Sequence, residues 1–153
     1  MPLCLTALLP CPADSFNCLF VPGIGWHTAA PTVTTSGSAA IPTSLASYWG
    51  DIAALTPECS KRVFLQRDMA NTAWSDAELA QALCDAAGAS TAGQEVANTV
   101  VYSLDVGNLA VAGAVATGQC SLATSSQWIQ LQVRVSHGVN GGVRVRYQCS
   151  SSR

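Results

Sequence analysis

Two runs of alternating apolar and polar residues near the end of the chain constrain the fold most. Residues 129–135 place Ile, Leu and Val at every second position, and residues 143–149 repeat the pattern with Val, Tyr and Cys. Such alternation predicts strands with one buried face. The residues between the runs are rich in Gly and contain Asn140-Gly141, which favours a tight hairpin turn. We therefore predict a C-terminal β-hairpin.

Two segments carry the spacing of helices. Apolar residues three and four positions apart predict a helix over residues 44–55 and another over residues 74–88. In the second segment, Ser75 followed by Glu78 forms a capping box, which predicts Ser75 as the N-cap. Gly88 then supplies the C-terminal stop.

Three further segments are apolar enough to be strands. Residues 62–66 form a short apolar run, and residues 109–115 alternate Leu, Val and Gly with alanines. The alternation predicts a strand with one smooth, alanine-lined face. Residues 96–104 fit both a helical and a strand period, so their assignment stays open.

The expected fold class is α+β and β-rich, and it has four parts. These are an antiparallel sheet or sandwich, the C-terminal hairpin, one or two short helices, and an extended N-terminal arm rich in Pro. Residues 1–43 hold six of the seven prolines, so they are assigned to the arm. Residues 44–153 are assigned to a single β-rich globular domain.

Seven cysteines are the candidates for disulfide bonds. No two of them form a Cys-x-x-Cys pair, which argues against a zinc site, and we expect no metal or other cofactor. Buried free thiols are the alternative to disulfides. The odd number leaves one thiol free or bonded to another chain. The candidates are Cys4, Cys11, Cys18, Cys59, Cys84, Cys120 and Cys149.

The chain is poor in charge, and its few charges are divided unevenly. Charged residues make up 10%, against about 25% in typical soluble domains. Residues 1–105 carry nine acids and three bases, whereas residues 106–153 carry four bases and no acid. Arg134, Arg144 and Arg146 fall on the outward face of the predicted hairpin, where they could meet an acidic subunit surface or another anion. Nucleic acid is an open but less favoured partner, because the density of bases is low.

No catalytic motif is present in the sequence. Neither Gly-x-Ser-x-Gly, His-Glu-x-x-His nor a phosphate-binding loop occurs. Cys18, His27 and Asp51 could form a nucleophilic trio only if the fold brings them together, and His137 falls in the predicted hairpin turn. We therefore expect a protein that is not an enzyme.

Low charge, a surface of small residues, an extended arm and cysteines together suggest a structural protein. We predict a subunit of a large multimeric assembly, namely a virus or phage particle, as a head decoration, collar, tail or spike protein. Its partners would be copies of itself and other assembly subunits, with no membrane involved, since no apolar run is long enough to span a bilayer. The virion, made in the cytosol and released to an oxidising exterior, is the expected location. The alternative is a secreted, disulfide-bonded binding module, such as an adhesin or a carbohydrate-binding β-sandwich.

Overall fold

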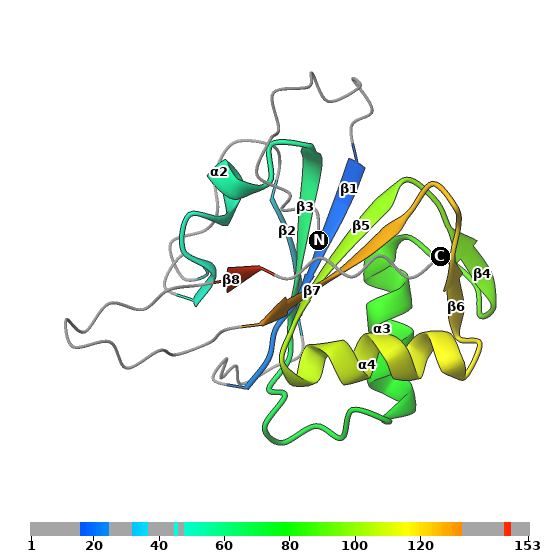
Figure 1. Cartoon of the computed structure of the whole chain (residues 1–153). Coiled ribbons are helices and arrows are strands. Elements are labelled where there is room, and N and C mark those ends of the chain that lie inside the picture. Colours follow the sequence, from blue (N-terminus) through cyan, green and yellow to red (C-terminus); the bar gives the residue numbers. More distant parts are fainter. Residues whose placement is uncertain (1–15, 25–31, 37–44, 46–47, 133–145, 148–153) are drawn as a thin grey trace.

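The computed structural model describes residues 16–24, 32–36, 45, 48–132 and 146–147 (Figure 1). Its main feature is a six-stranded sheet in the order β2-β3-β1-β5-β7-β8. The four central strands β3, β1, β5 and β7 are parallel, and the edge strands β2 and β8 pair antiparallel with their neighbours. The strands are β1 (Phe16–Val21), β2 (Thr32–Ser36), β3 (Cys59–Gln66), β5 (Thr99–Leu104), β7 (Gln127–Gln132) and β8 (Arg146–Tyr147).

This architecture contradicts the expected antiparallel sheet or sandwich. The chain is a mixed α/β protein, because the connections between its parallel strands carry helices. Helix α3 (Ala77–Ala87) lies between β3 and β5, and α4 (Val106–Ala116) lies between β5 and β7. Strands β1, β3 and β5 carry runs of consecutive buried residues, so they lack the alternation on which the sequence prediction relied.

Each face of the sheet is covered by its own apolar cluster. Leu19 and Val21 of β1 pack with the buried residues of α3 and α4. The alternate residues Cys18 and Phe20 point to the other face, where Phe20 stacks on Phe64 and Tyr102 with ring centroids 4.8 and 5.1 Å apart. Helices α3 and α4 therefore lie on one side of the sheet, as Figure 1 shows, and an aromatic layer fills the other.

Helix α3 confirms the predicted helix over residues 74–88, with the cap shifted by one position. Asp76 is the N-cap, and its carboxylate accepts the N–H groups of Glu78 and Leu79 at 2.8 and 3.0 Å. Gly88 ends the helix in the left-handed conformation at φ 103°.

Helix α4 replaces the strand predicted at residues 109–115. Its buried residues Gly107, Ala110, Val111 and Ala114 follow a helical period. The prediction was wrong because Leu109 and Val115, which completed the alternating pattern, are exposed at 49% and 38%.

A second, smaller sheet flanks the two long helices. It pairs β4 (Gln94–Val96) with β6 (Cys120–Leu122) in parallel, and a disulfide between Cys84 and Cys120 ties it to α3. The open segment 96–104 therefore resolves into the end of β4, a turn and the buried strand β5.

The predicted arm over residues 1–43 is wrong for two of its segments. Strand β1 is a central strand of the sheet and β2 is an edge strand, so the globular unit starts well before residue 44. For β1 the reason is that a strand buried on both faces needs no alternation. The other residues of the predicted arm lie outside the described part.

Three further sequence predictions concern individual segments. The strand at 62–66 is confirmed as part of β3. Of the helix expected over 44–55, the structure describes helical residues at 45 and 48–49 and the short helix α2 (Ile52–Leu55). In the predicted hairpin, β7 and β8 pair antiparallel, with Leu131 opposite Tyr147, and the turn lies outside the described residues.

Candidate functional site

The strand order marks one edge of the sheet as the place for a ligand. Strands β1 and β5 are neighbours, but the chain leaves β1 toward β3 on one side and leaves β5 toward β7 on the other. In open parallel sheets, ligands bind outside the carboxyl ends of two strands whose connections diverge in this way. Here these ends are Pro22–Gly23 after β1 and Asp105 after β5.

Asp105 forms the whole connection between β5 and α4. Its backbone has φ 52° and ψ −122°, a conformation that L-residues rarely adopt. Such backbone strain costs roughly 1–3 kcal/mol and gathers at functional sites. Among the described residues, Asn98 is the other non-glycine with positive φ. Asn tolerates that region well, so Asp105 is the position that needs an explanation.

Two glycines hold this turn against the end of β1. A Cβ atom on Gly107 would lie 2.5 Å from the carbonyl oxygen of Pro22, so α4 packs directly on the β1 backbone. A Cβ atom on Gly23 would lie 2.6 Å from Cβ of Asp105. The two connections are therefore in contact, and neither position admits a side chain.

A network of side-chain hydrogen bonds supports the turn at Asp105. The hydroxyl of Ser103, which is fully buried, donates to Oδ1 of Asn108 at 2.6 Å. It also accepts the indole N–H of Trp128 at 2.7 Å. These bonds join β5, the first turn of α4 and β7. The chain is therefore held in place both before and after Asp105.

Tyr48 brings a phenol to the same edge. Its oxygen accepts the N–H of Gly23 at 2.8 Å, and its ring meets that of Trp49 edge-on with centroids 5.2 Å apart. Burial raises the pKa of Tyr48, the hydrogen bond from Gly23 lowers it, and the negative charge of Asp105 raises it, with a net increase. Tyr48 therefore keeps its proton and lies within the electrostatic reach of Asp105.

The edge thus combines three chemical features. The Asp105 side chain is exposed to solvent, at the N-terminal end of an 11-residue helix whose dipole favours a negative charge. A protonated phenol lies nearby. Backbone N–H groups begin α4 at the same place. A carboxylate in this setting can bind a cationic or polar ligand or attack an electrophilic carbon.

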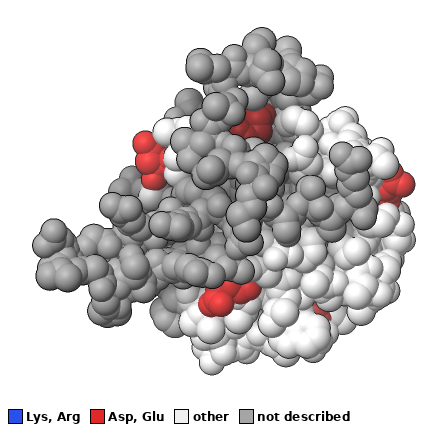
Figure 2. All heavy atoms as spheres, viewed as in Figure 1, with Lys and Arg blue, Asp and Glu red and all other residues white. Residues whose placement is uncertain are grey.

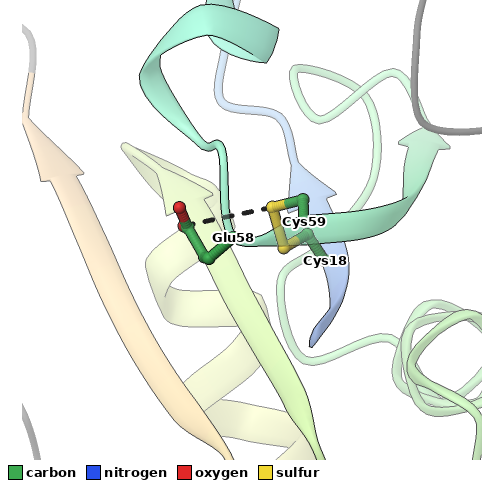
Figure 3. Close-up of side chains that lie close together, drawn as sticks. All are labelled: Cys18, Glu58 and Cys59. Atoms are coloured by element: carbon green, nitrogen blue, oxygen red, sulfur yellow. Dashed lines mark hydrogen bonds between the residues drawn. A yellow bond between two sulfur atoms is a disulfide. The ribbon is translucent and has the colours of Figure 1, made fainter. Parts of the chain in front are cut away.

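A second cluster, at Cys18, Glu58 and Cys59, has a different character (Figure 3). Its potential ligand atoms lie within 4.8 Å of one another, as in a metal site. The two sulfur atoms, however, form a disulfide between β1 and β3. Neither is a thiolate, and the 4.0 Å approach of Cys59 Sγ to Glu58 involves no sulfur-bound proton. Tyr102 donates its hydroxyl to the Glu58 carboxylate, so the cluster is structural in this oxidised form.

The predicted disulfide candidates fall into two groups. The structure pairs Cys18 with Cys59 and Cys84 with Cys120. Cys4, Cys11 and Cys149 lie outside the described residues. Because Cys18 is bonded within the core, it cannot serve as the nucleophile of a trio with His27 and Asp51.

The arginine patch cannot be placed as a whole. Arg134 and Arg144 lie outside the described residues, as do His27 and His137. Arg146 lies on strand β8 next to Gln132 of β7. Strand β8, which carries Arg146, is the edge strand at the opposite end of the sheet from β2.

Sequence reasoning missed Asp105, although a signal existed. Ser103-Leu104-Asp105-Val106-Gly107 has small residues two positions before and after an acid, between a strand and a helix. This is the spacing of Gly-x-Ser-x-Gly with other residues in it. This spacing indicates a nucleophile turn only where a strand precedes it and a helix follows it. The alternating pattern predicts a strand at residues 109–115, where the structure has helix α4.

The surface and the comparisons add little to this site. On the face shown in Figure 2, acidic side chains are scattered, and no Lys or Arg of the described residues is visible. Among the described residues, no helix is long and apolar enough to cross a bilayer. Comparisons with protein families, curated proteins and solved structures found no match.

Proposed function

We propose that the carboxyl edge of β1 and β5 is the active site of a hydrolase in which the Asp105 carboxylate attacks an electrophilic carbon. The observation that carries this proposal is the conformation of Asp105, with φ 52° and ψ −122° in a one-residue turn from strand to helix. Hydrolases of the α/β type expose their nucleophile on such a turn, above the middle of a parallel sheet. The analogy concerns local geometry and strand order, since no sequence motif is shared.

The packing around Asp105 supports this role. Strain at one residue persists only where its surroundings enforce it. Gly23, Gly107 and the Ser103 network enforce it here, at a place where a sequence selected for stability alone would accommodate Gly. The exposed Asp105 carboxylate makes no cap hydrogen bond to α4 that would explain the strain structurally, so a chemical use is the better explanation.

The reaction would take place in two steps. A carboxylate oxygen of Asp105 forms a bond to the carbon, the bond from that carbon to its leaving group breaks, and the leaving group departs with the electron pair. Water then attacks the carbonyl carbon of the resulting ester, which releases an alcohol and restores the carboxylate. The N–H groups that begin α4 would stabilise the negative charge on the ester oxygen in the second step.

An electrophilic probe tests the proposal. The folded, oxidised protein is incubated with an aryl glycidyl ether and quenched in acid at early times, before water hydrolyses the ester, and modified carboxylates are located by peptide mass spectrometry. We expect an ester on Asp105 to form at least about a hundredfold faster than on Glu95, since a positioned nucleophile gains orders of magnitude over a free one. Glu95 is a suited reference because it is also exposed but lies in the small sheet.

Two variants complete this test. Asp105→Asn should abolish the fast modification, and Glu95→Gln should leave it unchanged. Modification that is equally slow at both carboxylates of the wild-type protein would overturn the proposal.

The expectation of a non-enzymatic assembly subunit remains a separate prediction. Its grounds are compositional, and so are those of the secreted alternative. The sequence-based test also stands: replacing Arg134, Arg144 and Arg146 with Gln should weaken self-association while the fold is kept. We favour the hydrolase because a specific backbone feature supports it, whereas no described feature favours an assembly.

A further inference from the structure

The cluster of Cys18, Glu58 and Cys59 contains a set of metal ligands that becomes free when its disulfide is reduced. Each residue offers one donor atom, and the three atoms lie within 4.8 Å of one another. Figure 3 shows the Glu58 carboxylate facing the disulfide. Two thiolates and one carboxylate are ligands that Zn²⁺ accepts, and water can complete its four-coordinate shell. The bond between the two sulfur atoms is what prevents this role in the oxidised protein.

Glu58 forms the accessible side of the cluster. Cys18 and Cys59 are buried, whereas Glu58 is partly exposed, so an ion and its water ligand have a path beside the carboxylate. The hydroxyl of Tyr102 donates to Oε1 of Glu58. Carboxylates that bind metals are usually oriented by such a hydrogen bond. The third ligand is therefore already held in place in the oxidised protein.

A buried positive charge lies next to the cluster. Arg62 donates from Nη2 to the carbonyl oxygen of Thr56 at 2.6 Å, and the N–H of Cys59 donates to the same oxygen at 3.2 Å. Arg62 is also opposite Cys18 in the register of β1 and β3. Two thiolates and a carboxylate carry three negative charges, which the two charges of Zn²⁺ and the guanidinium balance. The occupied site would be neutral as a whole, as burial favours.

The second disulfide is a natural control. Cys84 and Cys120 are also buried, and their bond joins α3 to β6. Within the described ranges, however, the cluster of Cys18, Glu58 and Cys59 is the one group of three His, Cys, Asp or Glu residues close enough to share an ion. Reduction at Cys84 and Cys120 therefore gives two thiols without a third ligand.

We propose that Cys18, Glu58 and Cys59 bind Zn²⁺ when the chain is reduced, so that the metal replaces the disulfide as the link between β1 and β3. A dithiol reductant gives two electrons and two protons to the disulfide, which becomes two thiols, and the dithiol itself becomes a disulfide. Zinc then binds both sulfur atoms and an oxygen of Glu58, and the two thiol protons pass to water. This inference does not depend on the proposed role of Asp105.

Zinc binding is measured on the full-length protein, both oxidised and reduced with a phosphine, which competes for zinc less than a dithiol does. Competition with a coloured chelator gives the affinity. Loss of one outer-shell partner weakens metal binding by about 10–100-fold, so the loss of two thiolate ligands costs at least about a hundredfold. We therefore expect the reduced protein to bind Zn²⁺ at least about a hundredfold more tightly than the oxidised protein. Zinc should raise the melting temperature of the reduced protein alone.

Three variants assign the ligands. Glu58→Gln keeps both thiols and an oxygen that can accept the bond from Tyr102, and it should bind Zn²⁺ at least about tenfold more weakly. Cys18→Ser should lose the tight site. The double variant Cys84→Ser, Cys120→Ser should bind zinc as the wild type does. Affinity that is equal in the oxidised and reduced proteins, or that is unchanged in Glu58→Gln or Cys18→Ser, would overturn the inference.

Discussion

Gly107→Ala tests whether the turn at Asp105 depends on direct contact between α4 and β1. The new Cβ atom would lie 2.5 Å from the carbonyl oxygen of Pro22 and 3.0 Å from that of Val21, where ordinary contacts begin at 3.4 Å. Both neighbours are backbone atoms at the end of a central strand, so they cannot rotate away. Helix α4 must shift instead.

The expected loss of stability is the difference between two effects. Overpacking costs about 1–3 kcal/mol, and Ala in place of Gly inside a helix returns up to about 1 kcal/mol. We expect a net destabilisation of about 1–2 kcal/mol, which lowers the melting temperature by about 2–8 °C in a chain of this length. The same shift of α4 should slow the modification of Asp105.

Gly113→Ala is the matched control on the same helix. Its Cβ atom would meet the ring of Trp74 at 3.4 Å, an ordinary contact, so only the helix propensity applies. This variant should gain up to about 1 kcal/mol. Unfolding of both variants in urea, with the disulfides intact, measures the difference. If Gly107→Ala were as stable as Gly113→Ala, the close approach of α4 to β1 would be refuted.

Two further predictions concern a helix cap and the electrostatics of the site. Asp76→Ala should destabilise the protein by about 1 kcal/mol, and Ser75→Ala by much less, because the carboxylate of Asp76 accepts the two N–H groups; equal losses in thermal unfolding would contradict the assignment of the cap. Asp105→Asn removes the negative charge that raises the pKa of Tyr48, so this pKa should fall in an NMR titration of selectively labelled tyrosine; an unchanged pKa would contradict their proximity. Since folding raises the pKa of Tyr48, its contribution to stability is present below the pKa of an unfolded tyrosine, near 10, and is lost as the pH rises through the higher folded value.

The part of the fold that the sequence predicts well is the part with strong local signals. Helix α3 carries a capping residue, an apolar face and a terminal Gly88, and all three act within the helix itself. The N-cap was misplaced by one residue because Ser75 and Asp76 are both good caps, and only the backbone decides between them.

The errors occur where the spacing of apolar residues is ambiguous or where burial on both faces removes it. In α4, alanines fit a helix and a strand equally well, and exposed Leu109 completes a false alternation. Strand β1 follows a stretch rich in Pro and has no polar face, so its central position comes only from pairing with β3 and β5.

The candidate site is harder still to predict, because it depends on the topology. Asp105 and Gly23 are 82 positions apart in sequence, and only the parallel order of β1 and β5 brings them into contact. Tyr48 comes from a third segment, and its place near Asp105 follows from the packing of the aromatic layer. No local pattern could contain these relations.

The central claim is that Asp105 is the nucleophile. It is tested most directly by letting the protein hydrolyse the aryl glycidyl ether in water enriched in oxygen-18 and measuring where the heavy oxygen is found. If Asp105 forms an ester and water attacks its carbonyl carbon, the heavy oxygen enters the carboxylate of Asp105, and mass spectrometry finds it in the peptide that contains this residue. The account predicts this incorporation in the wild-type protein. Heavy oxygen in the product alone, with the Asp105 peptide unchanged, would mean that water attacks the substrate directly and would contradict the account.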